Sequence, residues 1–216
     1  MKYLIFSDSH LSNIFDERKY NFLKLVVDKA DIVIINGDFW EGYDFKIGDF
    51  IDSKWSGLFN LLKDKKTIYL YGNHDKKEYS NKKIGLFSVR QQRKLKLISG
   101  NKIFFIEHGD RITPLWDKYF KRMPRIINKF LYYLEKSGVL LLGIKGLGIL
   151  YRRFNDNMKK KVSISLKKNE YLVCGHSHYM EIDEKNHFIN SGMIKHGIGQ
   201  YITIEDGKVE LHNERY

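Results

Sequence analysis

The sequence predicts a mixed α/β sandwich, and two patterns carry this prediction. In the first half of the chain, short apolar runs of strand length alternate with segments whose apolar residues recur at helical spacing. In the second half, apolar runs are separated by turn residues such as Gly100-Asn101 and Asp206-Gly207, which is typical of β-hairpins. Strands that alternate with helices and then form hairpins are expected where sheets are covered by helices.

The elements of the first half follow from these periods. We expect strands over 2–7, 31–36 and 67–71, and helices over 16–30 and 50–62. On the first helix, Phe22, Leu23, Val26 and Val27 share one face, which predicts that this face packs on the core. The run over 31–36 is almost entirely β-branched, which is typical of a strand buried on both faces.

The second half is expected to contain mostly strands. They are predicted over 94–99, 102–107, 171–174, 187–189, 201–204 and 208–211. A chain of 216 residues has room for one sizeable core, and its hydrophobic content of 43% argues against a disordered chain. We therefore predict a single domain over 1–216.

One segment differs from the rest in charge. The net charge is +12, and the segment over 111–168 holds 15 basic and 3 acidic residues, so it accounts for the whole excess. It also contains both prolines, Pro114 and Pro124. We interpret residues 112–167 as an insertion carried within the single domain.

The insertion is predicted to be helical, because Ile126, Ile127 and Phe130 begin an apolar stripe between basic residues. Such a helix is typical of a membrane-surface element, and equally of a solvated basic helix that packs on the core through its stripe. The adjoining apolar stretch over 138–150 favours a lid or a lipid contact.

Cysteine content and the apolar stretches predict the compartment. Cys174 is the only cysteine, so no internal disulfide forms, which suits a reducing compartment, and we expect its side chain to be buried. The apolar start of the chain is too short for a signal peptide, and the stretch over 139–150 falls short of the roughly 20 residues that span a bilayer. We expect a cytoplasmic protein that contacts the inner membrane face through the insertion.

Five short polar motifs occur in a fixed order, and several follow a predicted strand directly. They are Asp8-Ser9-His10, Gly37-Asp38, Gly72-Asn73-His74-Asp75, His108-Gly109-Asp110 and Gly175-His176-Ser177-His178. Each contains Asp, Asn or His, the side chains that bind divalent cations. Because ligands at strand ends converge on one crevice of an α/β sheet, the ordered set predicts one shared site.

The residue types in these motifs predict a site for two cations. Asp8 and His10 are two residues apart, as are His176 and His178, so on an extended strand end each pair points the same way. The predicted ligands are Asp8, His10, Asp38, Asn73, His108, His176 and His178. Three oxygen donors and four imidazoles suit two borderline metals, Mn²⁺, Fe²⁺ or Zn²⁺, better than one.

The chemistry of such a pair points to phosphate hydrolysis. Two metals roughly 4 Å apart clamp a phosphoryl group and lower the pKa of a bridging water. Among the remaining polar residues, His74 is placed to protonate the leaving oxygen or to bind a phosphoryl oxygen. Asp75 would then fix the tautomer of His74.

The pattern D-x-H, GD, GNHD, HGD, GHSH resembles the signature of the calcineurin-like metallophosphoesterase superfamily over nearly the whole chain outside the insertion. The resemblance implies a four-layer α/β/β/α fold with the site above the sheets and His74 and Asp75 as the catalytic pair. It implies two ligand sets that share Asp38. These are Asp8, His10, Asp38 and His178 for one metal, and Asp38, Asn73, His108 and His176 for the other.

Within this superfamily the chain is most similar to the UDP-2,3-diacylglucosamine hydrolase group, by length, by the His-Gly-Asp fourth motif and by the place of the insertion. That group cleaves a pyrophosphate in a lipid-linked nucleotide, and its helical lid shields the acyl chains. An arginine stands in that group where this chain has His74, the commoner form in the superfamily. The favoured prediction is a manganese-dependent pyrophosphatase or phosphoesterase that acts on a lipid-linked nucleotide diphosphate.

Three other functions stay open on the sequence. The first is a phosphodiesterase or phosphomonoesterase for soluble substrates. The second is a nuclease, because a basic patch suits a nucleic-acid backbone. Aliphatic runs such as 139–142 argue against it, although four aromatic side chains that could stack on bases lie in the insertion: Tyr119, Phe120, Tyr132 and Tyr133. The third is a non-catalytic scaffold, which would be expected to have lost ligands, and none is missing.

Overall fold

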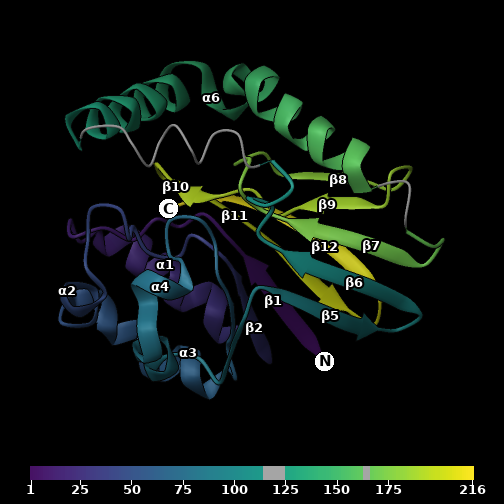
Figure 1. Ribbon diagram of the computed structural model, residues 1–216, viewed down its shortest axis with the longest axis horizontal. Helices are drawn as coiled ribbons and strands as arrows, with labels where there is room; N and C mark the ends of the chain where they lie inside the picture. Colours follow the sequence, from purple (N-terminus) through teal and green to yellow (C-terminus); the bar gives the residue numbers. More distant parts are fainter. Residues whose placement is uncertain (114–124, 163–165) are drawn as a thin grey trace.

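In the computed structural model of the chain, two β-sheets pack face to face between helices (Figure 1). The structure describes residues 1–113, 125–162 and 166–216. The strands are β1 (Lys2–Phe6), β2 (Ile32–Asn36), β3 (Ile68–Leu70), β4 (Arg90–Gln92), β5 (Lys94–Ser99), β6 (Lys102–Glu107), β7 (Glu170–Cys174), β8 (Glu181–Asp183), β9 (Phe188–Asn190), β10 (Ile194–Lys195), β11 (Ile198–Glu205) and β12 (Lys208–Arg215). The helices are α1 (Glu17–Asp28), α2 (Ile47–Ile51), η1 (Lys54–Leu58), α3 (Phe59–Asp64), α4 (Lys77–Ser80), η2 (Asn81–Leu86) and α6 (Arg125–Val162).

The order of the strands brings several strand ends to one place. The first sheet runs β10-β11-β1-β2-β3-β4, with β12 beside β11, and the second runs β5-β6-β7-β9-β8. Strands β1, β2 and β3 are parallel, and so are β6, β7 and β9. Parallel strands end at the same edge of a sheet, so each sheet presents a row of loops there.

The core between the two sheets is aliphatic and aromatic. Ile5, Ile34 and Leu70 from the first sheet pack with Phe104 and Val173 from the second, and all five are buried. The neighbouring residues of β2 face a separate cluster beneath the helices. The prediction that this strand is buried on both faces is therefore confirmed.

Helix α1 covers the other face of the first sheet through the predicted stripe. Phe22, Leu23, Val26 and Val27 are buried, and the side chain of Asp16 accepts a hydrogen bond from Lys19 N at the start of the helix. The single helix predicted over 50–62 is wrong, because the segment forms α2, η1 and α3 instead. Ser53 interrupts it, since its hydroxyl accepts from Trp55 N and starts a new helix.

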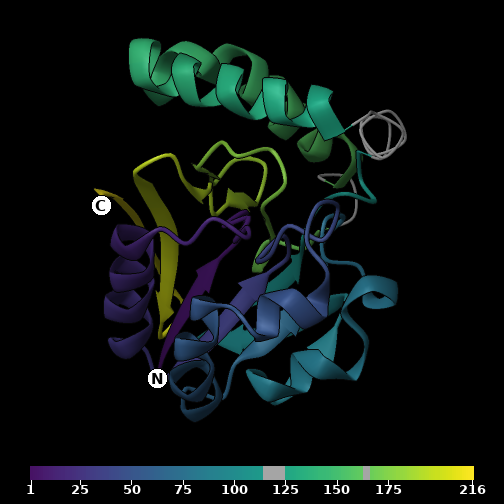
Figure 2. The same ribbon diagram turned by 90° about the vertical axis from the view of Figure 1, so that its left-hand side faces the viewer.

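Helix α6 lies across one end of the sandwich (Figures 1 and 2). Near its C-terminal end, Met158 packs against Leu172, Cys174 and Phe188 on the outer side of the second sheet. Nearer its start, Val139 packs against Met193 and Ile198. The two sheets with helices packed against them match the predicted sandwich, α6 agrees with the predicted helical character of residues 112–167 over its described range, and Cys174 is buried as expected.

Other predictions about the insertion are not addressed by these contacts. Residues 114–124, with both prolines, Tyr119 and Phe120, lie outside the described residues, as does the side chain of Tyr132. Movement of the segment as a lid stays a prediction. Across the part of the chain that the structure describes, no helix combines the length and the apolar character needed to cross a membrane.

Candidate metal centre

The five motifs lie in the loops that directly follow β1, β2, β3, β6 and β7. Loops after the first three strands come from the first sheet, and those after β6 and β7 come from the second. The side chains therefore meet where the carboxyl ends of both sheets face each other. All seven predicted ligands are brought together there.

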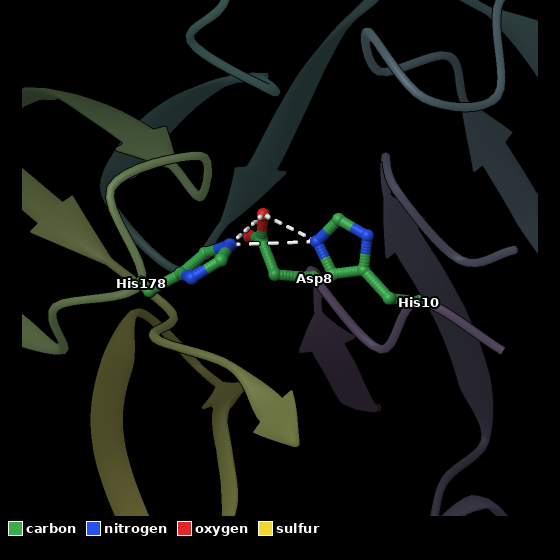
Figure 3. A group of neighbouring side chains, drawn as sticks. All are labelled: Asp8, His10 and His178. Atoms are coloured by element: carbon green, nitrogen blue, oxygen red, sulfur yellow. Dashed lines mark hydrogen bonds and ion pairs between the residues drawn. The ribbon is translucent and has the colours of Figure 1, made fainter. Parts of the chain in front are cut away.

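Asp8, His10 and His178 form one group of ligand atoms that lie within 4.8 Å of one another. Figure 3 shows the Asp8 carboxylate between the two imidazole rings. Asp8 Oδ1 is 3.3 Å from His178 Nε2 and 3.9 Å from His10 Nε2, and the two Nε2 atoms are 3.4 Å apart. Three donor atoms thus surround one small space.

A second group of atoms within the same spacing comes from Asp38, His108 and His176. Asp38 Oδ2 is 3.2 Å from His108 Nε2. The amide oxygen of Asn73 is 3.1 Å from His108 Nε2 and 3.0 Å from His176 Nδ1. The predicted second ligand set is therefore assembled as well.

Asp38 belongs to the second group and also faces the first. Its Oδ2 atom is 3.2 Å from His108 Nε2 in one group and 3.9 Å from His10 Nε2 in the other. Its Oδ1 atom accepts a hydrogen bond from the backbone N–H of His74 at 2.8 Å. That bond fixes the carboxylate, so a single oxygen faces both groups, as a bridging ligand requires.

The hydrogen bonds around the imidazoles fit cation binding. His10 Nδ1 donates to Glu41 at 3.0 Å, His108 Nδ1 to the Asn36 carbonyl at 2.8 Å, and His178 Nδ1 to Glu135 at 2.9 Å. A ring whose Nδ1 carries the proton presents the lone pair of Nε2 to a metal. In addition, Asp8 Oδ1 is buried and has no hydrogen-bond partner among the described residues. This set of donors fits two divalent cations.

The backbone conformation of the ligands differs from the prediction. Asp8, His10, His176 and His178 were expected on extended strand ends, and this is wrong, because their φ angles are 52°, 43°, 66° and 58°. Left-handed backbone costs an L-residue about 1–2 kcal/mol. Residues in such conformations cluster at functional sites, where the surrounding structure holds them in place.

Two motif glycines allow the loops to approach each other. A Cβ atom on Gly72 would overlap Asp38 Oδ1 and lie 2.7 Å from Asp38 N. A Cβ atom on Gly175 would lie 2.6 Å from Asp8 Oδ2. Any larger residue at either position would displace a carboxylate of the candidate centre.

His74 lies beside the two groups of ligands, and its ring is held by a residue that the motifs did not indicate. Glu41 Oε1 accepts from His74 Nδ1 at 2.6 Å, while Oε2 of the same carboxylate accepts from His10. His74 Nε2 lies 3.9 Å from Asp38 Oδ2. Burial lowers the pKa of His74, but Glu41 and Asp38 outweigh it and raise the pKa to about 9.

Asp75 does not take the place that was predicted for it, because the partner of His74 Nδ1 is Glu41. The Asp75 carboxylate accepts from the backbone N–H groups of Phe39 and Gly72, both at 2.7 Å, and from the Tyr69 hydroxyl. It therefore ties the loop after β2 to the loop after β3. Burial, followed by the nearby Asp38 charge, raises the pKa of Asp75 to about 6.

The four ligand imidazoles divide into two pairs by pKa. Burial, together with the neighbouring imidazoles His74 and His108, lowers the pKa of His10 to about 4 and that of His176 to about 3. For His178, burial acts in the same direction, but Glu135 and Asp8 raise its pKa to about 9. Asp38 and Asp8 likewise outweigh burial and hold the pKa of His108 well above its usual value. Without metal, protons on His108 and His178 thus balance the carboxylates.

A cavity of about 310 Å³ lies beside the third and fourth motifs. Its lining includes three cationic side chains, Lys76, Arg93 and Arg111. Glu78 and Asp110 line it as well. The cavity therefore offers positive charge close in sequence to His74 and His108.

Sequence reasoning missed Glu41 and Glu135, although each carboxylate contacts a predicted ligand. Glu41 stands three residues after Asp38, and a search for acidic residues next to the motifs would have found it. Glu135 is one of only three acidic residues between 111 and 168, and that isolation was a usable signal.

Comparison with known proteins agrees with this architecture. The model of the calcineurin-like phosphoesterase family matches residues 1–180. The chain is similar to YfcE, a phosphoesterase from E. coli, with a TM-score of 0.50 and 15% identity over 95% of this chain and 89% of YfcE.

Two further structures are more distant in shape. A Vps29 single mutant from Entamoeba histolytica gives a TM-score of 0.45 and 13% identity over 100% of this chain and 99% of that one. An archaeal phosphodiesterase gives a TM-score of 0.47 and 16% identity over the full length of both chains. At these identities the likeness concerns the fold alone. No curated protein sequence matches the chain.

Proposed function

Because the chain belongs to the calcineurin-like phosphoesterase family, we propose that it is a two-metal hydrolase of phosphoesters or phosphoanhydrides. The single observation that supports this most directly is the position of Asp38 Oδ2, which faces both groups of ligand atoms. A binding or scaffold protein has no need of a fixed carboxylate between two such groups, since that arrangement concentrates buried charge.

In this proposal the two cations share Asp38. One is held by Asp8, His10, Asp38 and His178, and the other by Asp38, Asn73, His108 and His176. Mn²⁺ is the favoured metal, with Fe²⁺ and Zn²⁺ as alternatives, because mixed oxygen and imidazole donors suit all three. When bound, two divalent cations in such a site neutralise a phosphoryl group and acidify a water molecule.

His74 is proposed as the general acid. The Glu41 carboxylate fixes its ring through Nδ1 and leaves Nε2–H to donate to the leaving oxygen. A pKa raised to about 9 in the metal-free protein keeps His74 protonated at neutral pH. Asp75 is proposed to act through position, because it holds the backbone of both Phe39 and Gly72 beside the ligands Asp38 and Asn73.

The favoured substrate is a lipid-linked nucleotide diphosphate such as UDP-2,3-diacylglucosamine. Lys76, Arg93 and Arg111 supply positive charge for phosphates in the cavity beside the third motif. On α6, Phe130, Leu134 and Leu141 are 65%, 58% and 81% exposed, and such apolar surface suits acyl chains. We also propose that this surface brings the protein to the cytoplasmic face of a membrane.

A second candidate is a phosphodiesterase for soluble substrates. The observation in its favour is that two acidic side chains, Glu78 and Asp110, line the same cavity and offset most of its positive charge. A diester carries less charge than a nucleotide diphosphate, so it needs fewer cations for recognition.

Hydrolysis of UDP-2,3-diacylglucosamine and of bis-p-nitrophenyl phosphate with Mn²⁺ tests both candidates. The wild type is compared with Asp38→Ala and with a triple variant of α6, Phe130→Ser, Leu134→Ser and Leu141→Ser. The matched control replaces exposed apolar residues elsewhere, Leu25→Ser, Val89→Ser and Ile98→Ser. We expect Asp38→Ala to lose both activities and the α6 variant to lose only turnover of the lipid substrate.

The outcomes separate the candidates. Brisk diesterase activity with no turnover of the lipid substrate by the wild type would exclude the lipid-linked assignment and keep the two-metal hydrolase. Full diesterase activity in Asp38→Ala would exclude the two-metal mechanism itself.

A further inference from the structure

Glu135 on α6 reaches the candidate metal centre from outside the five motifs. Its Oε1 atom accepts from His178 Nδ1 at 2.9 Å and from the Tyr151 hydroxyl at 2.9 Å. Its Oε2 atom accepts from Lys195 Nζ at 2.6 Å and from His196 Nε2 at 3.1 Å. The side chain is only 15% exposed, so each of these bonds lies in a sheltered environment.

We propose that Glu135 is a positioning residue for His178, so that docking of α6 and cation binding at Asp8, His10 and His178 depend on each other. The inference rests on the proposed function, because it takes these three residues as metal ligands. Of their carboxylate partners, Glu135 is the one that comes from the long basic helix rather than from a motif loop.

The geometry assigns this role for a chemical reason. An imidazole can turn about its own bonds, and a hydrogen bond on Nδ1 is what fixes the direction of its Nε2 lone pair. For His178 that bond goes to Glu135, whereas His10 has Glu41 and His108 has the Asn36 carbonyl. If α6 moved away from the sheets, His178 would lose the partner that orients it.

Other contacts of α6 concentrate on the same loop. Ser177 Oγ donates to Asn155 Oδ1 at 2.6 Å, and Asn155 Nδ2 donates to the Tyr179 carbonyl at 3.0 Å. Both Ser177 and Tyr179 are neighbours of His178 in the chain. The helix therefore holds the loop of the fifth motif at three successive residues, Ser177, His178 and Tyr179, and its docking sets the position of that loop.

Because coupling between two events is reciprocal, bound cation must also stabilise the docked helix. This distinguishes the inference from a purely structural role, in which Glu135 would only offset the charge of Lys195. A structural role predicts a loss of stability on removal of Glu135 and no change in cation affinity.

The test measures Mn²⁺ binding by competition with a fluorescent chelator, and the magnetic coupling of bound Mn²⁺ by electron paramagnetic resonance. Two substitutions remove the bond to His178: Glu135→Ala, and the double variant Glu135→Met with Lys195→Met. The double variant removes both partners of the buried pair and keeps their volume, which protects the fold if Glu135→Ala does not fold. The control is Lys159→Met, which breaks the contacts of α6 with Glu181 and Asp183 and leaves His178 untouched.

We expect the wild type to bind two coupled Mn²⁺ ions. Both Glu135 variants should bind one ion about 10- to 100-fold more weakly and lose the coupling signal at low Mn²⁺. Lys159→Met should keep both sites. Hydrogen exchange in α6 should slow on addition of Mn²⁺ in the wild type and in Lys159→Met, but not in the Glu135 variants.

Three results would contradict the proposed role of Glu135, and each has a different consequence for the proposed function. Wild-type affinity in the folded Glu135 variants would overturn this inference and leave the proposed function intact. Equal weakening in Lys159→Met, with α6 still protected in hydrogen exchange, would overturn it as well, because the loss of affinity would then not depend on the bond from Glu135 to His178. A wild type that binds no Mn²⁺ would overturn both the inference and the proposed metal centre.

Discussion

At the scale of single residues, the protonation of two ligand histidines predicts how cations bind. In the metal-free protein, neighbouring carboxylates raise the pKa of His178 to about 9 and hold that of His108 well above its usual value. A cation must displace these protons, so Mn²⁺ binding near pH 7.5 should release about two protons. Calorimetry in buffers of different ionisation enthalpy measures this number. Release of none would show that neither ring is protonated before the cation binds.

The raised pKa of His178 also determines how the stability of the metal-free protein changes with pH. A raised pKa means that protonated His178 stabilises the metal-free fold fully below about pH 6.5, the value of an unperturbed histidine. That contribution is lost as the pH rises through about 9. The share of His178 in the proton release should therefore fall toward zero above that pH, and cation affinity should rise as this competing proton is lost.

His74 gives a second prediction at this scale, and it depends on the leaving group. His74→Gln should lower kcat about 10²–10⁴-fold on a substrate with an alkoxide or phosphate leaving group, as expected for loss of a general acid. The defect should be much smaller on p-nitrophenyl esters, because p-nitrophenolate leaves without a proton. Steady-state rates on the two substrates test whether His74 acts as the general acid. The Mn²⁺ stoichiometry of the variant is the control for loss of metal. An equal defect on both would assign His74 to binding of a phosphoryl oxygen instead.

Single residues also mark the limit of what the sequence predicts. The seven candidate ligands and His74 could be singled out because rare residue types follow apolar runs in a fixed order. Glu41 and Glu135 belong to none of the motifs, and their positions give a weaker signal, since the chain has 26 acidic residues and carboxylates are common on surfaces. The bond from Glu135 to His178 joins residues 43 positions apart and depends on where a whole helix docks. Likewise, the turn that gives Asp8 a φ of 52° follows from packing against Gly37 and Gly175, which spacing alone does not reveal.

At the scale of elements, α6 is a structural layer as well as a candidate substrate surface. Met158 is fully buried against Leu172, Cys174 and Phe188. Met158→Ala should therefore destabilise the protein by about 2–5 kcal/mol, because a cavity forms between helix and sheet. Urea denaturation measures the change.

The matched control for Met158 is Phe130→Ala on the same helix. Phe130 is 65% exposed, so its loss should change stability by less than about 0.5 kcal/mol. If Met158→Ala proved equally mild, α6 would be a loosely attached lid rather than a layer of the fold.

Elements with strong local patterns were predicted better than short ones. The apolar stripe of α1 and the β-branched run of β2 specify both type and burial. Strands β4, β8 and β10 were missed, because each has only two or three residues and is paired by its neighbours rather than by its own pattern. The helix predicted over 50–62 divides at Ser53, where a side-chain bond competes with the helical backbone.

At the scale of the whole molecule, the candidate centre joins the two sheets. The candidate ligands Asp8, His10, Asp38 and Asn73 follow strands of the first sheet, whereas His108, His176 and His178 follow strands of the second. Each ligand set therefore contains residues from both sheets, and a cation bound by it connects the two layers. The left-handed conformations of five of these candidate ligands add a cost that the metal-free protein carries without this connection.

Cation binding should consequently stabilise the whole fold rather than one loop. At a free Mn²⁺ concentration of 100 times Kd, each occupied site should add about 2.7 kcal/mol to the free energy of unfolding. Urea denaturation of the wild type in Mn²⁺ and in EDTA measures the gain. Asp38→Asn, which weakens the ligand common to both sets, should lose most of it. A gain confined to hydrogen exchange in the ligand loops, with no shift in the urea midpoint, would mean that the sheets hold together independently of the cations. An equal gain in Asp38→Asn would mean that Mn²⁺ acts elsewhere on the protein.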